Sequence, residues 1–166
     1  KVDEAWVDNF QKSDPIYLAN GAINAVMDGT NHLDIVIETP NTEDLFKPKN
    51  LAKIEQLQQF INQFDNVGGT TSIVDYIKQM NRALNQGGAE HYVLPKDEQL
   101  ISQYFLLYSA SGDPTDFEQE IDYDYRFALV RARINTGSYQ ANTRIVESVQ
   151  AYIDSEFDHS ADEPEI

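Results

Sequence analysis

A run of seven residues, Leu33–Thr39, constrains the fold of this chain most strongly. Leu33, Ile35 and Ile37 recur at every second position, which is the period of a β-strand with one face toward a core. Pro40 follows directly, and proline cannot continue the hydrogen-bond ladder of a central strand. The run therefore predicts a strand around which the neighbouring segments fold.

The segments on either side predict an α+β fold. Apolar residues recur at helical spacing in most of them, and Tyr125–Ile134 shows a second strand-like alternation. We expect lead-in helices in residues 1–32, an α+β domain in residues 33–157 and an acidic frayed tail in residues 158–166. Within the domain the expected order is strand 33–39, helix 48–64, strand 67–71, helix 73–84, inserted helix 97–108, strand 125–134 and a last helix ending near 157. Such a sandwich normally adds a fourth strand next, so we expect that the chain is truncated before it.

Two short patterns predict how the helices begin and end. Ser72 and Asp75 have the spacing of a capping box, in which each side chain bonds to the backbone of the other. The run Asn85–Gly88 predicts the end of the helix that Ser72 begins, because glycine is the usual C-terminal stop. The inserted helix carries a wide apolar stripe, which predicts burial on more than one of its sides.

The charge balance excludes one class of function. The chain has 12 Lys and Arg against 28 Asp and Glu, a formal net charge of -16. Binding to nucleic-acid phosphates or to anionic lipid headgroups requires a basic surface, so neither is expected. The acidity is typical of a soluble surface, and the sharper alternative is attraction of cations or basic partners.

Composition also limits the chemistry of the chain. It has no cysteine, which excludes disulfides and thiol catalysis. No run approaches the roughly 20 apolar residues of a membrane span. The chain begins with a polar segment and no initiator Met, so we expect it to be an excised piece of a longer protein.

No motif identifies a catalytic, cofactor or metal site. His32, His91 and His159 are far apart and lack the spacing of metal ligands. The acidic segment 113–124 has ligands of the type calcium prefers, but it lacks the glycine and the terminal Glu of a calcium loop, so a solvated loop is favoured. The many carboxylates leave an acid-using hydrolase open, with no pair that stands out.

The tyrosines allow two interpretations. Tyr92, Tyr104, Tyr108, Tyr123 and Tyr125 could line an apolar cleft with a polar rim, but ordinary packing at the edge of a core is favoured. If the chain handles an apolar substrate, the candidates for contact are Tyr92, Tyr104, Phe105 and Tyr108.

Three stretches resemble a known family. Thr71–Leu84, Tyr92–Pro95 and Leu100–Tyr108 are similar to the large extracytoplasmic loop of exporters in the resistance–nodulation–division (RND) superfamily, in the branch related to MMPL and hopanoid or lipid transporters. Supporting similarity in residues 3–10, 29–33 and 122–126 extends the resemblance over nearly the whole chain. The start of the chain is more similar to the second of the two such loops.

The resemblance implies a role in transport. It implies a ferredoxin-like porter subdomain, with helices on one face of a small sheet, in a periplasmic loop of a bacterial inner-membrane protein. It also implies a proton-driven exporter of lipid-like or amphipathic cargo, with the other porter and transmembrane segments as partners, and it allows homo-oligomers. The proton-relay carboxylates of this family lie in its membrane helices, so no catalytic residue is implied in this chain.

Two other functions remain open at this point. A freestanding secreted module that binds a small apolar or cationic ligand would account for the tyrosines and the acidity. An acid-using hydrolase would rest on the abundance of carboxylates alone.

Overall fold

The computed structural model describes residues 5–111, 120–122 and 124–157. These residues form an α+β fold with five α-helices and one open three-stranded sheet. Short 3-10 helices lie at Trp6–Asn9, at Asp44–Phe46 (η2) and at Ala89–His91. The main elements are α1 Pro15–Met27, β1 Asn31–Glu38, α2 Pro48–Ile61, β2 Val67–Thr71, α3 Ile73–Leu84, α4 Glu98–Ser111, β3 Phe127–Ile134 and α5 Tyr139–Glu156.

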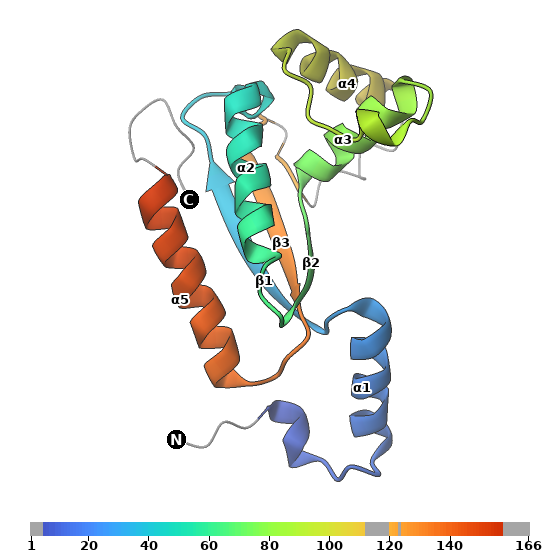
Figure 1. Cartoon of the computed structure of the whole chain (residues 1–166), viewed down its shortest axis with the longest axis vertical. Helices are drawn as coiled ribbons and strands as arrows, with labels where there is room; N and C mark the ends of the chain where they lie inside the picture. The colour runs from blue at the N-terminus through green and yellow to red at the C-terminus, as the bar shows by residue number, and fades with distance from the viewer. Residues whose placement is uncertain (1–4, 112–119, 123, 158–166) are drawn as a thin grey trace. The chain divides into compact units, whose positions relative to one another are not determined.

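The last strand of the chain is the central strand of the sheet. The order is β1-β3-β2, and β3 runs antiparallel to both neighbours (Figure 1). The ladder continues beyond the strand ends, where the Thr39 N–H donates to the Arg126 carbonyl at 2.8 Å and the Asn135 N–H donates to the Asn66 carbonyl at 3.0 Å. The expected sequence of strands and helices is thus confirmed, and the sheet order follows from pairing between distant segments.

The chain divides into two compact units, which we describe separately. Both units contain parts of the sheet, because the division passes through its strands. Unit 1 comprises Lys1–Asp34, Gln58–Thr70 and Arg131–Glu156, and unit 2 comprises Ile35–Leu57, Thr71–Val130 and Phe157–Ile166.

Unit 1 buries one stripe of α5. Ile145, Val149 and Ile153 recur at intervals of four and are buried, as their spacing predicts. Beside this stripe the rings of Phe60 and Tyr152 stack with centroids 4.2 Å apart. Burial, together with the nearby charge of Glu156, raises the pKa of the Tyr152 hydroxyl.

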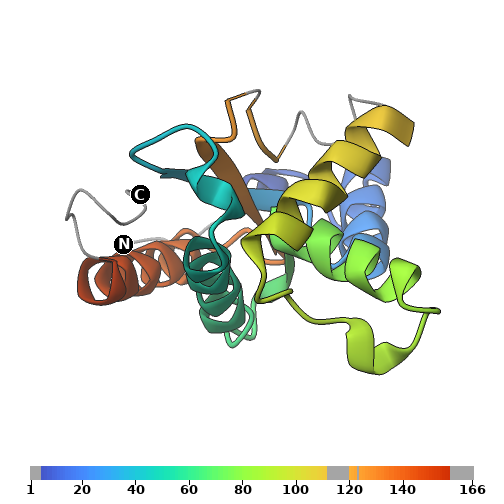
Figure 2. The same ribbon diagram turned by 90° about the horizontal axis from the view of Figure 1, so that it is seen from above.

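Unit 2 packs α3 against α4, which lie together in Figure 2. Ile77 on α3 and Ile101 on α4 are fully buried. Phe105 of α4 contacts the rings of Phe46 and Tyr125, with centroid distances of 4.7 and 5.6 Å. This aromatic group fixes η2 and the start of β3 against α4.

The predictions for both ends of α3 are confirmed. The Ser72 side chain accepts from the backbone of α3 and the Asp75 side chain accepts from the Ser72 N–H. The helix ends at Leu84, and Gln86 and Gly87 after it have left-handed φ angles of 63° and 80°.

One local prediction is wrong, because α4 buries one side and not several. Leu106 and Leu107 are exposed on this helix, whereas Ile101, Tyr104 and Phe105 are buried. The physical reason is that α4 has its neighbours in unit 2, α3 and η2, against one face. The acidic segment considered for calcium lies mostly outside the described residues.

Candidate functional site on the uncovered sheet face

Among the described residues, the sheet of unit 2 has one buried face and one face that stays partly exposed. Ala128 and Val130 of β3 are buried, whereas Phe127 and Leu129, on the other face, are not. On β1 the outward-facing residue is Val36, which is 55% exposed. Because successive strand residues point to opposite faces, these apolar side chains gather on the partly exposed one.

A short hairpin borders this face. The Asp122 carboxylate accepts from the backbone N–H groups of Arg126 and Phe127, both at 2.8 Å. These bonds hold the turn that carries Ile121 into an antiparallel bridge with Ala128. Tyr125 has φ 52° in this turn, a left-handed conformation that is rare for an aromatic residue.

The gathered residues line a shallow depression of about 250 Å³. We call its apolar lining the sheet-face patch, which consists of Val36, Phe127 and Leu129, with Ile121 of the hairpin at its edge. Acidic Glu120 and Asp122 border it. A surface of this kind can hold an apolar segment of a ligand or a neighbouring protein surface, with polar groups at the rim.

An ion pair lies at one end of the patch. The Arg126 guanidinium binds the Glu38 carboxylate, and its Nε–H donates to the Thr39 carbonyl at 3.3 Å. The guanidinium also lies 5.6 Å from the centre of the Phe127 ring. These contacts orient Arg126 alongside an apolar ring, an arrangement that suits contact with amphipathic molecules.

Unit 1 has a bidentate ion pair on its part of the sheet. Nε and Nη2 of Arg131 each donate to a carboxylate oxygen of Asp34 at 2.9 Å. The hydrogen bond from Arg131 lowers the pKa of Asp34. This pair crosses from β1 to β3 and stabilises their pairing, although its exposure keeps the contribution small.

Of the predicted substrate-contact residues whose side chains the structure describes, two are buried and one is partly exposed. Tyr104 and Phe105 are buried in the core of unit 2, and the Tyr108 side chain lies outside the described residues. The Tyr92 side chain is 37% exposed and lies beside two cationic side chains. Their contact with a substrate stays a prediction.

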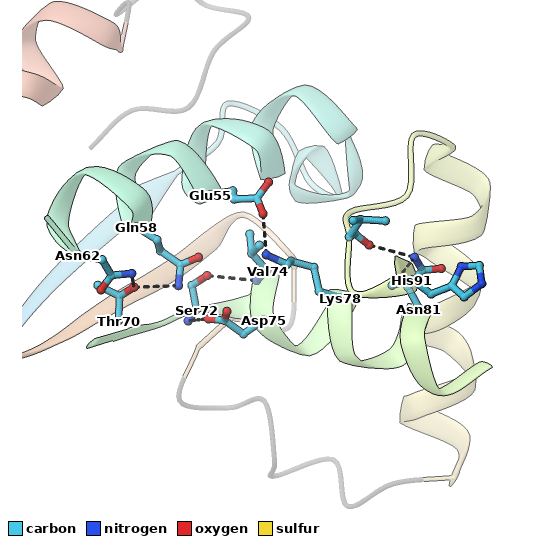
Figure 3. A network of polar contacts seen from close by, with 11 residues as sticks. Glu55, Gln58, Asn62, Thr70, Ser72, Val74, Asp75, Lys78, Asn81 and His91 are labelled. Carbon is cyan, nitrogen blue, oxygen red and sulfur yellow. Dashed lines mark hydrogen bonds and ion pairs between the residues drawn. The ribbon is translucent and has the colours of Figure 1, made fainter. Parts of the chain in front are cut away.

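Two cations surround Tyr92. Lys78 Nζ lies 4.8 Å from the centre of the Tyr92 ring and 2.7 Å from Glu55 Oε1, and Arg82 Cζ lies 5.7 Å from the same ring (Figure 3 shows the Lys78–Glu55 pair). The Tyr92 ring therefore packs against two charged side chains.

Tyr104 belongs to a buried polar network. Its hydroxyl donates to Asn81 Oδ1 at 2.8 Å, and Asn81 Nδ2 donates to the carbonyls of His91 and Val93 at 2.9 and 3.0 Å (Figure 3 shows Asn81 beside His91). Asn81 thus ties α3 to α4 and to the link between them. Of the two interpretations of the tyrosines, packing fits Tyr104 better.

Sequence reasoning missed the sheet-face patch, although a signal was present. Val36, Phe127 and Leu129 are apolar at the positions that face away from the buried side of their strands. Outward apolar residues on two strands of a half-covered sheet indicate a surface that contacts something else. The pairing of the two strands was needed to bring them together.

The chain has no detected relative. Searches of protein-family models, of curated proteins and of solved structures found no match. None of the helices that the structure describes is both long and apolar enough to cross a membrane. The described residues also contain no cluster of three or more His, Asp or Glu side chains that could hold a metal ion.

Proposed function

We propose that this chain is a periplasmic substrate-handling domain of a proton-driven RND-type exporter of lipid-like or amphipathic cargo. The observation that carries the proposal is the uncovered, apolar sheet face of unit 2. A domain that contacts amphipathic cargo or neighbouring porter segments needs an apolar surface that its own helices leave free. The resemblance of Thr71–Leu84 and Leu100–Tyr108 to the RND family adds the transport context.

The order of the strands supports a ferredoxin-like porter subdomain. In the chain β1, α2 and β2 follow one another, and β3 then inserts antiparallel between the two strands. This split β-α-β arrangement is the one that ferredoxin-like folds use. In this interpretation α3 and α4 form an insertion between β2 and β3, and α5 is the second helix of the fold.

The proposed role is mechanical and not catalytic. Export by alternating access moves compact domains that open and close a path for cargo. The sheet-face patch would contact cargo or another porter segment during this movement, and protons would pass elsewhere in the transporter.

The test uses the complete gene product in membranes. We expect it to need detergent for extraction and to export a fluorescent amphipathic substrate from cells. Leu129→Asp in the patch should lower export severalfold at equal protein level, because it places a charge on the apolar contact surface. The matched control is Leu84→Asp, at an exposed position near the end of α3.

Either of two results would overturn the proposal. A full gene product that is soluble after lysis without detergent would favour the alternative, a freestanding secreted module that binds a small ligand. Export that is equally insensitive to Leu129→Asp and Leu84→Asp would remove the patch from the mechanism.

A further inference from the structure

Unit 1 contains a cavity that the proposed function does not use. It lies between the start of β1, the end of β3 and the first turns of α5, and its volume is about 120 Å³. Ile134 and Ile145 are buried and form its floor, while Val146 is 48% exposed and borders its opening. Leu33 completes the apolar part of the lining, and its polar members are Asn31, His32 and Asn142.

One polar atom of the lining lacks a partner. Asn142 Oδ1 is buried, and no donor among the described residues bonds to it. A buried carbonyl oxygen without a hydrogen bond is unfavourable, so this atom is expected to receive one from a bound molecule. Asn31, which also lines the cavity, already donates from Nδ2 to the Thr136 carbonyl at 3.2 Å.

The size and lining indicate what the cavity can hold. A water molecule occupies about 30 Å³ in the liquid, and an apolar cavity of about 150 Å³ in another protein holds benzene. The cavity in unit 1 is thus several times larger than one water. Its lining has no Asp, Glu, Lys or Arg, and its one titratable side chain is the exposed imidazole of His32, so an apolar ligand fits it better than an ionic one.

We propose that this cavity is a binding site for a short branched aliphatic group that carries one hydrogen-bond donor, such as an aliphatic alcohol. The hydrocarbon would pack on Ile134 and Ile145, and the hydroxyl would donate to Asn142 Oδ1. The site is independent of the sheet-face patch, and its test does not depend on transport.

The test is an amide NMR titration of this chain with isobutanol as the probe. We expect saturable shifts that include Leu33, Ile134 and Ile145. Val146→Phe should abolish them by filling the opening, whereas Val93→Phe, an equivalent enlargement at an exposed valine of unit 2, should leave them unchanged. Well-dispersed spectra of both variants establish that each is folded.

A second comparison isolates the hydrogen bond. Asn142→Leu should weaken isobutanol binding about fivefold and leave isobutyl chloride, which has no donor, unaffected. Equal effects on both probes would overturn the assignment of the hydroxyl to Asn142. Shifts that never saturate, or that survive Val146→Phe, would overturn the site and leave a cavity that holds only water.

Discussion

The helices α1 and α3 are nearly equal in length, at 13 and 12 residues, and differ sharply in how they are used. α1 contains no charged residue, yet none of its residues is buried and Val26 is 81% exposed. α3 carries charged residues and buries Ile73, Val74 and Ile77 completely. The more apolar of the two helices is therefore the more exposed one.

Both helices have an apolar face. In α3 the buried residues fall on one face, and its charged residues cover the other. In α1 Leu18 lies nearly opposite Ile16 at 100° per residue, but four large apolar side chains fall within about 100° of one another, at Ile16, Ile23, Val26 and Met27. The comparison teaches that a periodic apolar face becomes buried only where another element of the fold packs against it.

The largest expected effect comes from removing one apolar side chain from each helix. Ile77→Ala should lower the free energy of unfolding by about 2–5 kcal/mol, because it leaves a cavity in a fully buried site. Ile23→Ala on α1, half exposed, should change it by less than about 1 kcal/mol. Urea unfolding of both variants measures the difference, and equal losses would show that α1 is packed after all.

The next effect comes from the buried polar network around Asn81 of α3. Asn81→Ala should cost about 1–3 kcal/mol, because the Tyr104 hydroxyl and two backbone carbonyls lose their partner in the core. Tyr104→Phe removes one of these bonds alone and should cost about 1 kcal/mol. Urea midpoints of the two variants give the ranking, and a larger loss for Tyr104→Phe would contradict the central role of Asn81.

The capping residues provide a smaller contrast. Ser72 caps α3 by accepting from the Val74 N–H at 3.1 Å, and Asp14 caps α1 by accepting from the Ile16 N–H at 2.9 Å. Ser72→Ala should lower global stability by about 1 kcal/mol. Asp14→Ala should reduce helicity in residues 15–18, seen by amide exchange, with a smaller change in the urea midpoint. The opposite ranking would place α1, and not α3, in the cooperative core.

Acidification should have the smallest effect on stability. It should act through carboxylates outside α1, because α1 contains none. Burial alone would raise the pKa of Asp44, but hydrogen bonds from Lys47 and Asn41 outweigh it and lower the pKa. A lowered pKa means that the carboxylate stabilises the fold above about pH 4 and that this contribution is lost as the pH falls further. Asp44→Asn should therefore reduce the difference between urea midpoints at pH 7 and pH 3.

The control for this pH series is Asp154→Asn, at an exposed position on α5. It should leave the acid sensitivity unchanged. If the stability of the wild-type protein does not fall between pH 4 and pH 3, this contradicts the assignment of acid sensitivity to Asp44 and to Asp34, whose pKa is also lowered.

Much of the fold was predictable from local patterns. The alternation of β1, the Ser72 capping box and the buried stripe of α5 each depend on residues within a few positions of one another. Such patterns act through backbone geometry and the local satisfaction of hydrogen bonds, which need no distant partner. The predicted order of the elements followed from them.

The candidate site was less predictable, because it depends on distant pairs. The sheet-face patch combines Val36 with residues of the hairpin at Ile121 and β3, about 90 positions later in the chain. The buried role of Tyr104 depends on Asn81, which lies on another helix. The sequence identified the aromatic residues as candidates, but it did not show which side chains contact them.

The sequence by itself determined where strands and helices begin and end to within a few residues, and which face of β1, β3 and α5 is apolar enough to be buried. Only the tertiary structure decided that β3 lies between β1 and β2, that α1 stays uncovered among the described residues and that one side of α4 remains exposed. Local periodicity fixes which face can be buried, but burial requires a partner surface, and that partner comes from pairing between segments far apart in the chain.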